Sequence, residues 1–192
     1  MATEAVRKKR RPHRRDEILA AAVGLFHERG YHATGMDEIG AAAGMTGPGI
    51  YRHFRNKEEI LETLIRQQGE AVLAEVERAA ESSGEASAVV DALVHTYVDG
   101  IVAEPSLAVV AMFERGTLSP ETRRWIDRME RRNVDLWVEA VHRARPDLTE
   151  AETRVVVHAA LTMGVTVCNY NSGLEPDHLA RILRPMVRAA LG

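Results

Sequence analysis

Glycines divide the start of this chain into short amphipathic segments, and that pattern constrains its fold more than any other feature. Apolar residues recur three and four positions apart before Gly30, and again between Gly30 and Gly44. Such spacing puts them on one face of an α-helix, and glycine is a common helix stop. A third run begins after Gly44, in which Ile50 and Phe54 lie four residues apart and are assigned to the core. Three short helices are therefore predicted, with a tight glycine turn between the second and the third.

Capping residues indicate where these helices begin. Thr34 is predicted to cap the second helix and Thr46 the third, since threonine hydroxyls satisfy the free N–H groups at helix starts. Asn56, followed three residues later by Glu59, resembles a capping box. This pair predicts a longer, connecting helix over residues 57–80.

Helical periodicity continues through the rest of the chain. The stretch ESSGEAS (81–87) is the clearest linker, and proline and glycine punctuate the apolar runs that follow it. No hairpin signature between alternating strands occurs. Further helices are predicted over residues 89–102, 107–115, 122–144, 150–169 and 177–191. The predicted fold class is all-α, with an N-terminal three-helix unit joined by the connecting helix to a larger helical domain.

Two short helices joined by a tight glycine turn are the physical description of a helix-turn-helix, whose recognition helix lies in the DNA major groove. Spacing alone leaves a plain helical bundle as the alternative. The residue types favour the helix-turn-helix. A close resemblance to the DNA-binding domain of the TetR/AcrR family of bacterial regulators is found in TGMDEI (34–39), AGMTGPGIYRHF (43–54) and NKEEIL (56–61). The resemblance covers about residues 14–62. It implies a transcriptional regulator that binds double-stranded operator DNA.

Nine residues of this motif are predicted to contact DNA. Gly47 and Gly49 lack bulk, so backbone and the Pro48 ring can approach base edges closely. Arg52 suits either a phosphate or a guanine, and spacing does not decide between them. The resemblance implies phosphate contacts at Thr34, Tyr51, His53 and Lys57, with half-buried packing as the alternative for Tyr51. Thr46 lies at a predicted helix start, where free N–H groups favour an anion. The predicted DNA-binding residues are Thr34, Thr46, Gly47, Pro48, Gly49, Tyr51, Arg52, His53 and Lys57.

Positive charge is concentrated in the same part of the chain, although the formal net charge of the whole is -3. Residues 1–60 hold 11 Lys and Arg against 8 Asp and Glu, whereas residues 61–192 hold 14 against 20. Seven of the nine residues in RKKRRPHRR (7–15) are basic, and such a segment binds phosphates without needing a fold. Residues 1–13 are predicted to be a disordered basic arm, either a DNA contact or a solvated tail.

The second half is predicted to form a homodimer. Residues 155–167 are apolar almost all round, so a helix there must be buried on every side. Together with the apolar stripe of the last helix, it predicts a four-helix-bundle interface between two subunits, with burial inside a monomer as the alternative. A dimer also suits DNA reading, because recognition helices about 34 Å apart match a palindromic operator. The predicted domains are thus residues 14–60 for DNA binding and 61–192 for ligand binding and dimerisation.

A small-molecule effector is implied by the family resemblance. It implies a repressor that releases its operator when a ligand moves the connecting helix. The apolar helices favour a hydrophobic effector, with lipid-like molecules and acyl-CoA as candidates. Core packing is the alternative for each side chain, and a regulator that answers to a protein partner, or to no ligand, is the alternative function. The candidate ligand-binding residues are His95, Tyr97, Met112, Phe113, Trp125, Met129, Trp137 and His158.

Other classes of function find little support in the sequence. The glycine cluster at residues 44–49 follows a helix and not a strand, which argues against a dinucleotide or phosphate loop. His27 and His32 are five residues apart, and no Cys or carboxylate pair supplies zinc-site spacing. We therefore expect no catalytic residues, no metal and no cofactor. Without a signal peptide or a membrane-length apolar run, the chain is expected to be cytoplasmic and to have no membrane partner.

Overall fold

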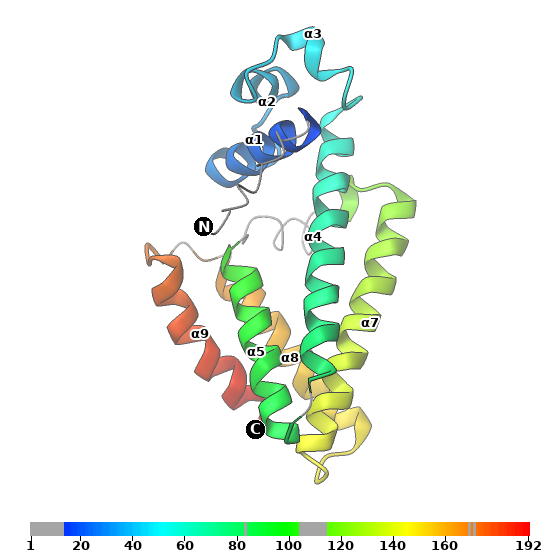
Figure 1. Ribbon diagram of the computed structural model, residues 1–192, viewed down its shortest axis with the longest axis vertical. Coiled ribbons are helices and arrows are strands. Elements are labelled where there is room, and N and C mark those ends of the chain that lie inside the picture. The colour runs from blue at the N-terminus through cyan, green and yellow to red at the C-terminus, as the bar shows by residue number, and fades with distance from the viewer. Residues whose placement is uncertain (1–13, 83, 104–114, 169, 171) are drawn as a thin grey trace, which may run out of the picture. The chain divides into compact units, whose positions relative to one another are not determined.

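The computed structural model describes residues 14–82, 84–103, 115–168, 170 and 172–192, and its regular elements in these ranges are all helices (Figure 1). The predicted all-α class is confirmed. The chain divides into two compact units, Met1–Ile60 and Leu61–Gly192. The predicted basic arm, residues 1–13, lies outside the described residues.

The first unit contains α1 (Arg14–Arg29), α2 (Met36–Ala42), α3 (Gly47–Ile50) and the start of α4 (Lys57–Ala80). They are drawn from blue to cyan in Figure 1. Gly30 follows α1 with a φ of +82°, and Gly44 follows α2 with a φ of +67°. Both angles lie in the left-handed region that side chains disfavour. The two predicted glycine stops are therefore confirmed.

The beginnings of α2 and α3 differ from the prediction. Gly35, and not Thr34, is the N-cap residue of α2, because the Thr34 hydroxyl donates instead to the backbone oxygen of Gly30 at 2.9 Å. Thr46 does occupy the N-cap position of α3, but its side chain makes no capping hydrogen bond. The third helix is also shorter than expected: it ends at Ile50, and a turn continues from there to His53.

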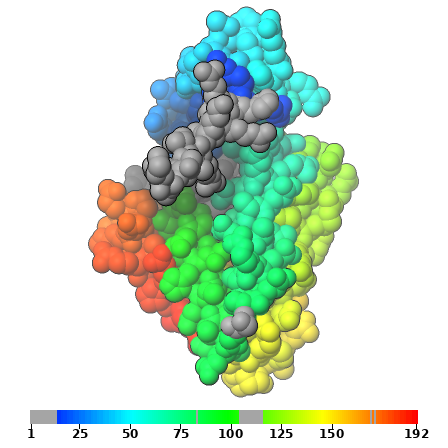
Figure 2. Space-filling model, in the orientation of Figure 1, coloured from blue at the N-terminus to red at the C-terminus, as the bar shows by residue number. Residues whose placement is uncertain are grey.

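The second unit contains the rest of α4 with α5 (Ala86–Ala103), α7 (Pro120–Ala144), α8 (Glu150–Cys168) and α9 (Pro176–Leu191). A short 3₁₀ turn, η1 (Arg115–Thr117), precedes α7. The helix expected over residues 107–115 falls almost wholly outside the described residues. Helix α5 packs against α7, α8 and α9 and forms the middle of the core. Figure 2 shows α5 (green) and α9 (red) side by side at the surface of this unit.

Helix α5 is long and apolar enough to cross a membrane when judged by length and composition alone. The expectation that the chain has no membrane-length apolar run is therefore not met by this measure. Eight residues of α5 are buried against the neighbouring helices. Its apolar composition is thus accounted for by its place in the core of a helical domain.

Helices α5 and α8 approach closely at Gly164. The hydroxyl of Tyr97 donates to the backbone oxygen of Leu161, and burial raises the pKa of this phenol above its ordinary value. A Cβ atom on Gly164 would lie 2.7 Å from Cε1 and 2.9 Å from Cζ of the Tyr97 ring. Only glycine lets the two helices come this close without displacing a buried aromatic ring.

Gly164→Ala is expected to lower the free energy of unfolding by about 1–3 kcal/mol, because the added methyl group overpacks the buried contact with Tyr97. The matched control is Gly100→Ala in α5, where the new Cβ would meet Val72 Cγ2 at an ordinary 3.9 Å. That change should raise the free energy of unfolding by about 0.5–1 kcal/mol. Urea denaturation followed by circular dichroism measures both variants, and equal effects would contradict the close packing at Gly164.

Helix α4 is attached to the first turns of α7 by polar contacts. The carboxylate of Glu62 accepts the backbone N–H of Ser119 at 2.7 Å, and Arg66 Nη2 donates to the Thr122 hydroxyl at 3.0 Å. Burial raises the pKa of Glu62, but the hydrogen bonds from Ser119 and Thr122 outweigh burial and hold it below its ordinary value. The two helices are therefore held together near the boundary between the two units.

One face of α8 and α9 remains exposed in the single chain. Val155 of α8 is 69% exposed, and Ile182 and Met186 of α9 are 40% and 44% exposed. Burial of residues 155–167 inside a monomer, the alternative considered for them, is therefore not observed, and burial against a second subunit stays a prediction. A face of this kind on two adjacent helices is available to a further protein surface.

Candidate nucleic-acid interface

The turn between α2 and α3 is built from backbone hydrogen bonds around Gly44. Its N–H donates to Ala41 O at 3.0 Å, and the N–H of Met45 donates to Gly40 O at 2.8 Å, so the last carbonyls of α2 are satisfied. Gly40 also lets the two helices approach, because a Cβ there would lie 3.6 Å from Ile50 Cβ. The orientation of α3 on α2 is fixed by this contact and by the turn.

Helix α3 and the turn after it have one buried and one exposed face. Ile50 and Phe54 are 0% and 1% exposed, as predicted for core residues. On the other side Pro48, Tyr51 and Arg52 are exposed. Tyr51 is 51% exposed, so about half of its surface is open to a partner. A proline ring, a phenol and a guanidinium are thus presented to solvent from consecutive turns of the chain.

Three of the four remaining predicted contacts at α3 are more enclosed. Thr46 is exposed, whereas Gly47, Gly49 and His53 are half-buried. A Cβ on Gly47 would lie 3.1 Å from Asp37 Oδ1, and one on Gly49 would lie 3.3 Å from Thr46 Oγ1. Larger residues at either glycine would crowd their neighbours at the start of α3. This is a packing reason for glycine, separate from the predicted close approach to DNA.

Arg15 fixes the end of this segment. Its Nη1 donates to the backbone oxygen of His53 at 2.6 Å, and its guanidinium lies 4.0 Å from the centroid of the Phe54 ring. In the sequence Arg15 belongs to the basic run RKKRRPHRR and was not considered further. Its role was missed because its partners are 38 and 39 residues away, and no local signal relates them.

Lys57, the first residue of α4, reaches the loop between α1 and α2 that contains Thr34. Thr34 is 2% exposed, and its hydroxyl is bonded inward to Gly30. The ammonium of Lys57 donates to Tyr31 O at 2.7 Å and to Thr34 O at 2.8 Å, and it lies 4.4 Å from the centroid of the Tyr31 ring. Both residues were expected to contact phosphates, and in the structure their polar side-chain atoms bind the backbone of their own unit.

The start of α4 is capped largely as predicted. Asn56 Oδ1 accepts the backbone N–H of Glu59 at 2.9 Å. The carboxylate of Glu59 reaches back one residue further than in a capping box and accepts the N–H of Arg55 at 2.8 Å. That hydrogen bond is the main reason why the pKa of Glu59 lies below its ordinary value.

The candidate ligand-binding residues do not form one cluster. Tyr97 and Trp137 are buried and pack edge to face at 5.9 Å between ring centroids. Trp125 and Met129 lie on α7 against Gly69 of α4, where a Cβ would come within 2.7 Å of Trp125 Cη2. Met112 and Phe113 lie outside the described residues. The aromatic candidates thus divide between the core and the contact of α4 with α7.

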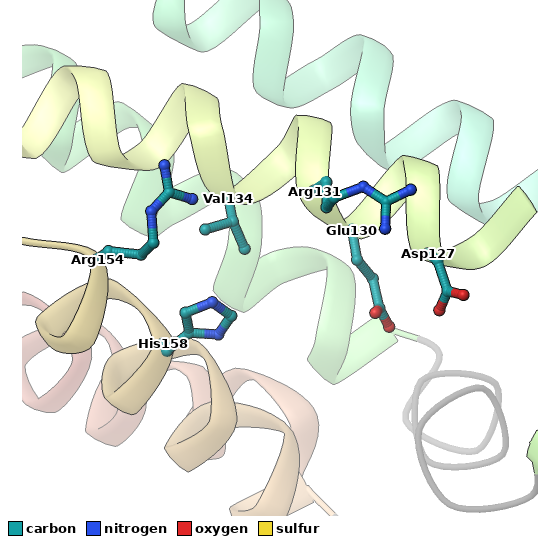
Figure 3. A pocket seen from close by; sticks show the side chains of 6 residues that line it. All are labelled: Asp127, Glu130, Arg131, Val134, Arg154 and His158. Carbon is teal, nitrogen blue, oxygen red and sulfur yellow. The ribbon is translucent and has the colours of Figure 1, made fainter. Parts of the chain in front are cut away.

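The two candidate histidines are exposed. His95 Nδ1 is 2.7 Å from the backbone oxygen of Asp91 in the preceding turn. His158 lines a hollow of about 170 Å³ on the surface between α7 and α8, where Figure 3 shows it and Arg154 facing Val134. Arg154 is ion-paired with Asp135 at 2.9 Å. Neither histidine is placed in the buried core beside Tyr97 and Trp137.

Known proteins resemble this chain in sequence and in fold. Residues 18–64 match the family described as bacterial regulatory proteins, tetR family. The transcriptional activator FasR of Mycolicibacterium smegmatis is 34% identical over 91 residues, which cover 47% of this chain and 42% of FasR. The repressor KstR2 of Rhodococcus jostii is 28% identical over 126 residues, covering 65% of this chain and 62% of KstR2.

A solved structure extends the likeness in fold to nearly the whole chain. The structure of AibR in complex with isovaleryl coenzyme A and operator DNA superimposes with a TM-score of 0.74 at 24% identity. The superposition covers 91% of this chain and 97% of AibR. At this identity the likeness is one of fold, and it includes both the helix-turn-helix unit and the larger helical unit.

Proposed function

We propose that this chain is a regulator of the TetR family, whose description residues 18–64 match, and that it is a repressor which a small hydrophobic effector releases from operator DNA. That it is a DNA-binding transcriptional regulator follows from the family itself, as the sequence resemblance implied. The observation that carries the proposal is the α2–turn–α3 unit, which buries Ile50 and Phe54 and exposes Pro48, Tyr51 and Arg52. Residues 14–60 would act as the DNA-binding domain, in the cytoplasm where the DNA is.

Direct contacts with DNA are proposed for the exposed face of α3 and the turn that follows. Pro48 and the two flanking glycines would meet base edges or thymine methyl groups, since they bring little bulk into the groove. Tyr51 would donate to a phosphate oxygen, and Arg52 would bind a phosphate or a guanine. Thr46 and His53 complete this proposed set.

A homodimer through α8 and α9 is proposed for residues 61–192. The exposed side chains of Val155, Ile182 and Met186 support it, because exposed large apolar side chains on two adjacent helices are typical of subunit contacts. Two copies joined in this way would present two recognition helices to the half-sites of a palindromic operator.

An acyl-CoA is the effector class we propose. Support comes from the isovaleryl coenzyme A in the complex of AibR, whose fold this chain shares. The polar contacts of Glu62 and Arg66 with the start of α7 supply a physical route, since a ligand that shifts α7 would move α4 with it. Helix α4 begins in the DNA-binding unit, so its movement would alter the position of α3.

The test begins with the full-length protein and a pool of random duplexes, from which bound sequences are selected. Fluorescence anisotropy should show the selected duplex bound at least about 10³-fold more tightly than a shuffled duplex of equal composition. Adding acyl-CoA of increasing chain length should lower that affinity by about 5- to 150-fold, whereas free coenzyme A should not. Equal affinity for both duplexes would contradict the regulator. A flat response to every acyl-CoA would contradict the effector alone.

A further inference from the structure

Lys57 is held within the DNA-binding unit by two short hydrogen bonds of its ammonium group to backbone oxygens and by a longer contact with a third. A lysine ammonium has three N–H donors. In the structure three backbone oxygens lie within reach of Nζ: Tyr31 at 2.7 Å, Thr34 at 2.8 Å and His32 at 3.5 Å. The Tyr31 ring below the ammonium, 4.4 Å away at its centroid, adds a cation–π contact. A phosphate would have to displace at least one of these contacts to bind Lys57.

These carbonyls belong to the loop that sets the start of α2. The oxygen of Tyr31 also accepts the N–H of Thr34 at 3.3 Å, and the Thr34 hydroxyl is bonded to Gly30. The next residue, Gly35, donates its N–H to the carboxylate of Glu38 at 2.8 Å as α2 begins. By binding both ends of the segment from Tyr31 to Thr34, Lys57 fixes where α2 leaves the loop.

The position of α2 is passed on to α3 by direct packing. Ile39 of α2 and Ile50 of α3 are both 0% exposed, and Gly40 admits Ile50 at van der Waals distance. At the other end of α3, Arg15 bonds the carbonyl of His53. Because Arg15 holds the chain at His53, a shift of the 31–34 loop would change the orientation of α3 relative to that point.

We propose that Lys57 is a positioning residue for sequence-specific DNA binding, which orients α3 through the 31–34 loop and does not bind a phosphate. The inference rests on the proposed function of the α2–turn–α3 unit. It replaces, for Lys57, the phosphate contact that the family resemblance implied. Positioning affects the fit of α3 to a particular base sequence, whereas a phosphate contact strengthens binding to every DNA sequence.

The first test compares Lys57→Met with the wild-type protein on the selected and the shuffled duplex across a range of salt concentrations. Methionine keeps an unbranched stem near Tyr31 and removes the ammonium. Affinity for the selected duplex should fall by about tenfold or more, with affinity for the shuffled duplex and its salt dependence unchanged. Loss of a phosphate contact would instead weaken binding to both duplexes and flatten the slope of log K against log salt by about 0.9 per subunit. That result would overturn the proposal.

Two controls accompany this test. Circular dichroism sets a working temperature well below the unfolding transition of the variant, so that a loss of stability alone does not change the ratio of the two affinities. Arg52→Met removes an exposed cation of the same unit, and it shows how large a change in salt slope the assay detects. If the wild-type protein binds both duplexes equally, the proposed function fails, whatever the variant does.

A second measurement needs no variant and no operator. Besides Lys57 the sequence contains only Lys8 and Lys9, so acetylation of each amine can be followed by mass spectrometry. Lys57 should react about tenfold or more slowly in the folded protein than in the same protein unfolded in urea, because its ammonium is bonded to carbonyls. Adding the selected duplex should leave this rate unchanged. Rapid acetylation of Lys57 in the free protein, with protection by DNA, would show that Lys57 binds a phosphate.

Discussion

Aspartate at both Ile182 and Met186 is expected to convert the proposed dimer into a monomer and to weaken operator binding by about 10²- to 10⁴-fold. The two side chains are 40% and 44% exposed on α9, and Val155 of the adjacent helix α8 is 69% exposed. A carboxylate in an apolar contact loses its hydration without gaining a partner. A monomer would then hold one half-site without the gain in effective concentration that the second recognition helix supplies.

Light scattering after size-exclusion chromatography measures the mass, and fluorescence anisotropy measures the affinity for the selected duplex. His142→Asp, at an exposed position on α7, is the matched control and should leave both unchanged. A double variant that stays dimeric and binds normally would place the subunit contact on another surface. A wild-type protein that is monomeric at micromolar concentration would contradict the dimer itself.

Trp137→Ala is expected to lower the free energy of unfolding by about 3–5 kcal/mol, the largest effect on stability that we predict for a single substitution. Trp137 is 0% exposed and packs edge to face on Tyr97 in the middle of the second unit. Its removal leaves a cavity that α5 and α7, both packed on other helices, can fill only in part. Urea denaturation followed by circular dichroism gives the measurement.

The other tryptophan of the same helix supplies the control. Trp125 is half-buried against Gly69 and Arg66, so Trp125→Ala should cost clearly less than Trp137→Ala. Trp137→Phe should also cost less, since it keeps an aromatic ring and removes an Nε1 that has no partner among the described residues. Equal losses for the two alanine variants would contradict the central place of Trp137 in the core.

The sequence predicted the helix-turn-helix correctly because its determinants are local. Gly30 and Gly44 stop their helices with positive φ angles, and Ile50 and Phe54 face inward because they lie one helical turn apart. Each of these signals depends on residues within a few positions of one another. The exposed residues of α3 follow from the same periodicity, since they are what remains on the opposite face.

The sequence was less informative about polar side chains. Thr34 looked like a helix cap and Lys57 like a phosphate ligand, yet both bind backbone oxygens of the loop between α1 and α2. Lys57 lies 23 to 26 residues from those oxygens, and Arg15 lies 38 from its own partner. A polar group bonds whichever partner the fold brings near, and no spacing rule in the sequence gives that distance.

The candidate ligand residues show the same division. Periodicity placed Tyr97 and Trp137 in apolar helices, but the sequence did not separate core packing from ligand contact. In the structure these two pack on each other, whereas His95 and His158 are exposed. Their environments depend on how α5, α7 and α8 pack against one another.

By itself, then, the sequence determined the all-helical fold, the glycine turn before α3 and the resemblance of the first unit to the TetR family. These follow from short-range backbone and hydrophobic patterns, which can be recognised within a segment of a few helical turns. Only the tertiary structure decided that Lys57 and Arg15 bind the backbone around α2 and α3, and that α8 and α9 keep an apolar face exposed. Those outcomes depend on contacts between segments far apart in the chain, which form only when the whole unit folds.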